Sequence, residues 1–173
     1  MRRYWAFYEA VNHPFFEESG REDIVLGSTI LVPLNDTNAS RRVIDFLLNL
    51  SLCGDTRLTL IHIFRKPSSG EELMGKKFMA EMPARLEKML SDEKARLVSE
   101  KGFDPENISI ELVDKGYASV TEGIIDYFKS GDFDMVVIGR KHMSKSEEFV
   151  LGDISAKLIR NLPKTAILVV KME

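Results

Sequence analysis

The chain has 173 residues, the length of about one folded domain, and 44% of them are hydrophobic, so it can bury a substantial core. Its net charge of −3 argues against a general nucleic-acid binder, which usually carries a basic surface. One cysteine, Cys53, cannot form an internal disulfide, and one cysteine with three histidines is too few for a common zinc site.

No apolar run reaches the roughly 18 residues that cross a bilayer. Near the N-terminus, Glu9, Asn12 and His13 interrupt the apolar stretch that a secretory signal requires. We therefore expect a cytoplasmic protein with no membrane partner.

The predicted strands are short apolar runs. Ser28–Leu34 is continuously apolar rather than alternating, which is typical of a strand covered on both faces. Further strands are predicted over residues 56–63, 108–113, 135–138 and 165–170. Gly116 is expected to break the chain after the third strand.

Between the predicted strands, apolar residues recur at the spacing of an amphipathic helix. The first helix has its apolar face at Val43, Phe46, Leu47 and Leu50. The second lies within Glu71–Lys101, where Pro83 marks either a kink or the first turn of a new helix, and it ends at Gly102. Its buried stripe is predicted to be Leu86, Met89, Leu90 and Leu97. The third carries Val120, Ile124, Ile125 and Phe128, and the last carries Ile154, Leu158, Ile159 and Leu162.

Alternating strands and helices over residues 28–173 predict an α/β domain with a parallel sheet and helices on both faces. Residues 1–27 are a separate, aromatic-rich extension. Six of the 15 aromatic residues of the chain lie in it: Tyr4, Trp5, Phe7, Tyr8, Phe15 and Phe16. This arm is predicted either to dock on a protein partner or second subunit, or to fold back on its own domain.

Two loops after strands carry the motifs. The first strand runs Ile-Leu-Val-Pro-Leu-Asn-Asp-Thr over residues 30–37, with Ser40 opening the next helix. The fourth strand ends Val136-Val-Ile-Gly139, and Gly152 follows. This pattern resembles the universal stress protein family over residues 28–173. The resemblance implies a three-layer fold with five strands in the order 3-2-1-4-5, so that both loops meet where the strand order reverses.

The resemblance also implies a nucleotide pocket, and three positions depart from its usual pattern. Nucleotide-binding members have Asp after the first strand, where this chain has Asn35. They also have Gly, two residues, Gly, nine residues, then Gly-Ser or Gly-Thr. Here the second glycine is His142, which adds a ring where backbone approaches phosphate, and the hydroxyl residue is Asp153, a fixed negative charge. The residues expected to line this degenerate pocket are Leu34, Asn35, Ile63, Ile138, Gly139, His142, Gly152, Asp153 and Ile154.

Each of these residues also has a simpler interpretation. Asp153 is a good helix N-cap, His142 a solvated loop residue, and Ile63 and Ile138 core residues. Likewise, Cys53 is expected to be a buried, inert thiol and His62 a half-buried histidine with its hydrogen bond satisfied rather than a base.

No spacing of Ser, His or Asp residues predicts a catalytic site, so we expect no enzyme, with weak ATPase activity left open. The first hypothesis is a dimeric regulatory or interaction module in the stress response that binds ATP weakly or not at all and requires no cofactor or metal. The second is an ATP- or AMP-binding switch, with Mg²⁺, in which Arg140, Lys141 and Lys145 replace the lost phosphate contacts. The third is a pocket for a neutral or cationic small ligand.

The last strand, Thr165–Val170, is predicted at an edge of the sheet with a very apolar outward face. The resemblance implies a homodimer formed through this strand.

Overall fold

The computed structural model describes residues 28–65, 76–140 and 154–171, and for residues 76–79 it describes the backbone only. Five strands form one parallel sheet in the order β3-β2-β1-β4-β5, which confirms the predicted topology. The strands are β1 (Thr29–Pro33), β2 (Arg57–Arg65), β3 (Ile108–Tyr117), β4 (Met135–Arg140) and β5 (Ala166–Lys171). The aromatic arm, residues 1–27, lies outside the described residues.

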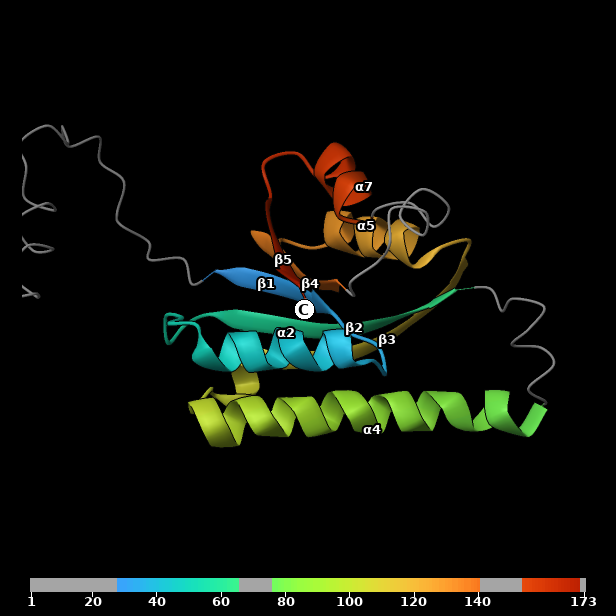
Figure 1. Cartoon of the computed structure of the whole chain (residues 1–173), viewed down its shortest axis with the longest axis horizontal. Coiled ribbons are helices and arrows are strands. Elements are labelled where there is room, and N and C mark those ends of the chain that lie inside the picture. The colour runs from blue at the N-terminus through green and yellow to red at the C-terminus, as the bar shows by residue number, and fades with distance from the viewer. Residues whose placement is uncertain (1–27, 66–75, 141–153, 172–173) are drawn as a thin grey trace, which may run out of the picture.

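Helices cover both faces of the sheet (Figure 1). One face packs against α2 (Asn38–Asn49) and α4 (Lys76–Lys101), and the other against α5 (Val120–Ser130) and α7 (Ile154–Asn161). The pleat of β1 divides the core, because Ile30 and Val32 join the α2/α4 side whereas Leu31 joins the α5/α7 side. A run that is apolar at every position therefore builds a strand with two buried faces.

The long helix α4 is continuous through Pro83, so Pro83 does not begin a new helix. Three members of its predicted stripe, Leu86, Leu90 and Leu97, are buried, and the fourth, Met89, is partly buried. The helix ends in an αL C-cap motif at Gly102, whose φ is +77°. The Gly102 amide donates to the Val98 carbonyl at 3.1 Å, and the next amide, of Phe103, donates to the Leu97 carbonyl at 3.4 Å.

Three local predictions are wrong. Strand β3 continues to Tyr117 with Gly116 inside it at φ +65°, at an irregularity where the pairing with β2 shifts, so Gly116 does not break the chain. Ile159 is 63% exposed because it flanks the stripe that α7 buries through Leu158. Cys53 is exposed in the turn after α2.

Among the helices described, none combines the length and the hydropathy that a membrane span requires.

Candidate functional site

The carboxyl ends of β1 and β4 are neighbours, and the sheet order reverses between them. The carboxyl ends of β1 and β4 therefore lie side by side at the reversal, which is where open parallel sheets place their ligands. Asn35 follows β1 there, and Gly139 lies near the end of β4. Of the predicted pocket, His142, Gly152 and Asp153 lie outside the described residues. Ile154 begins α7 and is 42% exposed.

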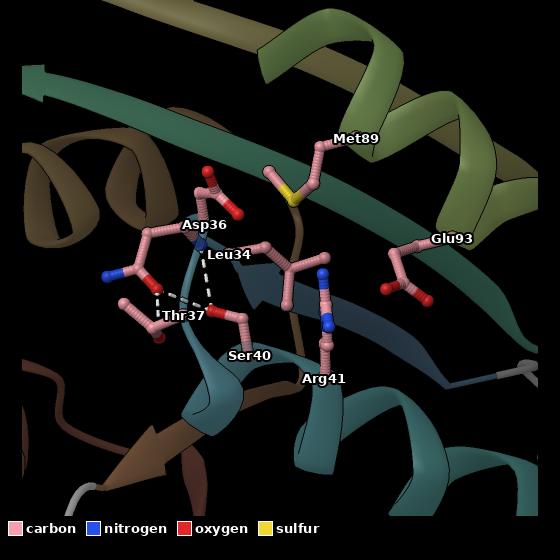
Figure 2. A pocket seen from close by; sticks show the side chains of 8 residues that line it. Leu34, Asp36, Thr37, Ser40, Arg41, Met89 and Glu93 are labelled. Carbon is pink, nitrogen blue, oxygen red and sulfur yellow. Dashed lines mark hydrogen bonds between the residues drawn. The ribbon is translucent and has the colours of Figure 1, made fainter. Parts of the chain in front are cut away.

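The turn between β1 and α2 is closed by hydrogen bonds around Asn35 (Figure 2). The Asn35 amide N–H donates to Ser40 Oγ at 2.8 Å, and the Ser40 hydroxyl donates back to Asn35 Oδ1 at 2.7 Å. The Thr37 hydroxyl donates to the same Oδ1 at 2.5 Å. An amide oxygen has two lone pairs, so this oxygen is fully occupied within the turn.

Ser40 is the residue of this turn that sequence reasoning undervalued. It was predicted only to open the helix, yet it is buried and makes two reciprocal bonds to Asn35. The available signal was its separation of five residues from Asn35 across a predicted strand-to-helix turn, with a hydroxyl that can donate and accept at once.

A shallow hollow lies between this turn and α4, as Figure 2 shows. Met89 and Glu93 from α4 face Ser40 and Arg41 from α2 across it. Its empty space is about 210 Å³ with open solvent included, which is below the range of about 300–1,000 Å³ typical of small-molecule pockets. The hollow that these described residues form is therefore smaller than a typical small-molecule pocket.

The apolar residues predicted for the pocket point to opposite faces of the sheet. Ile63 and Ile138 join the core on the α5/α7 side and are 3% and 5% exposed, whereas Leu34 joins the core on the α2/α4 side. Ile63 and Ile138 are therefore core components, whereas Leu34 both joins the core and lines the hollow beside the Asn35 turn.

His62 lies on β2 beside the end of β1. Its Nδ1 is 2.9 Å from the Leu34 carbonyl oxygen, so the neutral ring carries its proton on Nδ1 and donates it there. Burial lowers the pKa of the His62 imidazole below its ordinary value of 6.5, and the bond to Leu34 only partly opposes this shift. His62 is thus half-buried with a satisfied hydrogen bond, as predicted.

The charged residue within the turn itself, Asp36, is solvated. Asp36 lies 3.9 Å from the Arg85 Nε of α4, with about half of each side chain exposed, so this ion pair adds little to stability. Among the residues described, no group of three or more His, Cys, Asp or Glu side chains is placed to hold a metal ion.

Comparison with known proteins supports the family indicated by the motifs. The family model described as "Universal stress protein family" matches residues 27–171. No curated protein sequence matches the chain significantly.

Solved structures share the fold at low sequence identity. A universal stress protein crystallised in complex with cAMP has a TM-score of 0.60 and 15% identity, covering 84% of this chain and 98% of its own. UspA from Lactobacillus plantarum has a TM-score of 0.58 and 15% identity, covering 83% and 97%. The universal stress protein from Archaeoglobus fulgidus in complex with dAMP has a TM-score of 0.52 and 15% identity, covering 86% and 99%.

At these identities the solved structures establish the fold, and the family match extends over most of the sequence. The fold and the sheet order agree with that match. The chain belongs to the universal stress protein family.

Proposed function

We propose that this protein is a dimeric, non-catalytic regulatory or interaction module of the stress response that binds ATP weakly or not at all. The observation that carries the proposal is the hydrogen bonding of the Asn35 side chain. Its side chain is neutral, and its oxygen already accepts two hydroxyl hydrogen bonds inside the turn. A ligand that needs an acceptor or a metal-binding charge at this position must displace one of those bonds and still finds no charge.

The sequence motif that begins at Gly139 and ends at Asp153 supports the same conclusion. His142 places a ring where the family has a glycine, and Asp153 places a carboxylate where it has a hydroxyl. Two like charges about 4 Å apart repel by about 1–4 kcal/mol in a hydrated site. That repulsion corresponds to one to three decades of affinity for a phosphate group.

Dimerisation through β5 is supported by the difference between the two sheet edges. Residues 167–170 of β5 are apolar, partly exposed and free of charge, whereas β3 carries Glu111, Asp114 and Lys115. Charged residues on an edge strand discourage pairing with another chain, and their absence permits it. The β5 edge is therefore the better surface for a second copy.

A nucleotide switch is the second candidate, and the structures with bound cAMP and dAMP favour it. In this form Arg140, together with Lys141 and Lys145, supplies the contacts to phosphate. It predicts that nucleotide is retained through purification, whereas the first proposal predicts none.

The test is calorimetric titration of the purified chain with ATP and Mg²⁺, after assay of the denatured protein for released nucleotide. The proposal expects no nucleotide and no micromolar binding in the wild type. It also expects the double variant His142→Gly, Asp153→Ser to gain at least tenfold in ATP affinity. Micromolar binding by the wild type, or a double variant that binds no better, would overturn it.

The control for the double variant is Asp132→Ser, which removes an exposed carboxylate before the amino end of β4, at the opposite edge of the sheet. It lowers the net negative charge equally but leaves the frame intact, so its ATP affinity should equal that of the wild type. A thermal-shift screen with neutral and cationic ligands tests the remaining hypothesis, a pocket that does not take anions.

A further inference from the structure

Gly139 lies closer to α2 than any other residue type could. A Cβ atom built on it would be 2.5 Å from the Ala39 carbonyl oxygen and 2.8 Å from the Ala39 carbonyl carbon. It would also be 3.1 Å from Val43 Cγ2. The φ of Gly139 is not in the left-handed region, so its backbone does not itself require glycine. The requirement is steric, and the obstacle is backbone, which cannot rotate away as a side chain can.

The contact is linked to the Asn35 turn through consecutive residues of α2. Ala39 precedes Ser40, and Ser40 holds Asn35 by the two reciprocal hydrogen bonds described above. Displacing the first turn of α2 away from β4 would move Ser40 with it and strain both bonds. The close contact at Gly139 therefore affects the position of Asn35 even when no ligand is bound.

We infer that Gly139 is a positioning residue that seats the first turn of α2 on β4 and thereby fixes the Asn35 turn. Gly139 thus has a role in this chain that does not involve approach to a phosphate. It links the end of β4 to the turn after β1, which are two described parts of the candidate pocket. The inference rests on the proposed function only for the meaning of that pocket, and its test uses no nucleotide.

The test is amide hydrogen exchange of Gly139→Ala in the full chain, with the Asn35 amide as the reporter because its N–H donates to Ser40 Oγ. The matched control is Gly123→Ala on the opposite face, where a Cβ would lie 2.3 Å from Ile63 Cγ2 and 2.8 Å from Tyr117 Cδ2. Both variants insert a methyl group into a tight contact, but only Gly139→Ala pushes on α2. Gly54→Ala, with no atom within 4 Å of the added Cβ, controls for the substitution itself.

We expect the Asn35 amide to exchange at least tenfold faster in Gly139→Ala than in Gly123→Ala, after both are corrected for their global stability. Gly54→Ala should match the wild type. Equal Asn35 exchange in the two tight-glycine variants would overturn the inference, because the effect would then be general destabilisation.

Should Gly139→Ala fail to fold, native-state exchange of the wild type in low denaturant decides the question. The inference expects the Asn35 amide and the amides of residues 138–140 to exchange through the same opening, with the same denaturant dependence. Exchange of Asn35 through a separate local fluctuation would refute it. Neither result depends on whether ATP binds, so failure here is distinguishable from failure of the proposed function.

Discussion

Replacing Arg96 by methionine should loosen α4 from α2, because Arg96 links the two helices next to the hollow that Glu93 lines. Arg96 makes three contacts: Nη2 to Asp45 of α2 at 3.0 Å, Nη1 to Glu93 at 3.0 Å and Nε to Glu100 at 3.1 Å. The hydrogen bonds to Asp45 and Glu100 raise the pKa of the Arg96 guanidinium above its ordinary value, so it stays charged at every pH used in practice. Methionine keeps most of the apolar stem and removes only the charge and the donors.

The magnitude follows from how exposed the partners are. Asp45 and Glu100 are about half exposed, so each bond to them contributes under about 1 kcal/mol. The Glu93 side chain is only 11% exposed, and removing the partner of a fully buried charge costs about 3–5 kcal/mol. Because Arg96 itself is 35% exposed, water can replace part of the interaction. We expect a loss of about 2 kcal/mol.

Urea denaturation at fixed protein concentration measures this loss. Lys88→Met is the matched control, since Lys88 pairs with Asp92 on the same helix with both side chains well over half exposed, and its loss should stay under about 0.5 kcal/mol. Adding Glu93→Gln to Arg96→Met should recover part of the stability, because an unpaired amide costs less than an unpaired carboxylate. A single variant as stable as Lys88→Met, or a double variant less stable than the single, would refute the reasoning.

Three further predictions concern pH, a helix end and assembly. His62 of the unfolded chain binds a proton below about pH 6.5, whereas His62 of the folded chain does so only at lower pH, so the free energy of unfolding should fall as the pH drops below 6.5. His62→Gln should make this pH dependence shallower in urea titrations. Equal pH dependence in the variant and the wild type would contradict this. Gly102→Ala should cost about 1 kcal/mol in thermal unfolding because alanine is strained at φ +77°, and an unchanged midpoint would rule the strain out. Val169→Lys in β5 should give a monomer by sedimentation while the exposed Ile159→Lys does not; a dimer in both would exclude the β5 edge.

The fold was largely predictable because β1 and β4 are buried on both faces and contain continuous apolar runs. Alternation of strands and helices indicates a parallel sheet, but it does not give the order of the strands. That order came from the family resemblance, and the pairing of β1 with both β2 and β4 confirms it.

Two of the three local errors, at Gly116 and Ile159, have one cause, which is tertiary context. Gly116 looks like a chain break in sequence, yet β3 continues past it because Tyr117 still pairs with Arg65 across an irregularity. Ile159 fits the apolar spacing of a helix, yet α7 buries only the narrow stripe through Leu158. Spacing identifies which residues can share a face, whereas the width of the covered face depends on the neighbouring elements.

The position of the candidate site was predictable, whereas the hydrogen bonding of the Asn35 side chain was not. The strand pattern alone places Asn35 directly after the first strand, and the family resemblance places that point at the sheet reversal. Whether its oxygen is available depends on where two hydroxyls point, and only the structure shows that Thr37 and Ser40 both donate to it.

Gly139 shows why a motif residue does not by itself indicate a ligand. From sequence, its place in the frame suggests that it lets backbone approach a phosphate. In the structure its missing Cβ is required by the Ala39 carbonyl at 2.5 Å, a contact internal to the fold. At His142 and Asp153 the chain departs from the pattern that the family resemblance implies for phosphate binding, whereas a side chain at Gly139 would have to displace α2. This combination is expected under the proposed function, in which the pocket binds nucleotide weakly or not at all while the packing around Gly139 is still required.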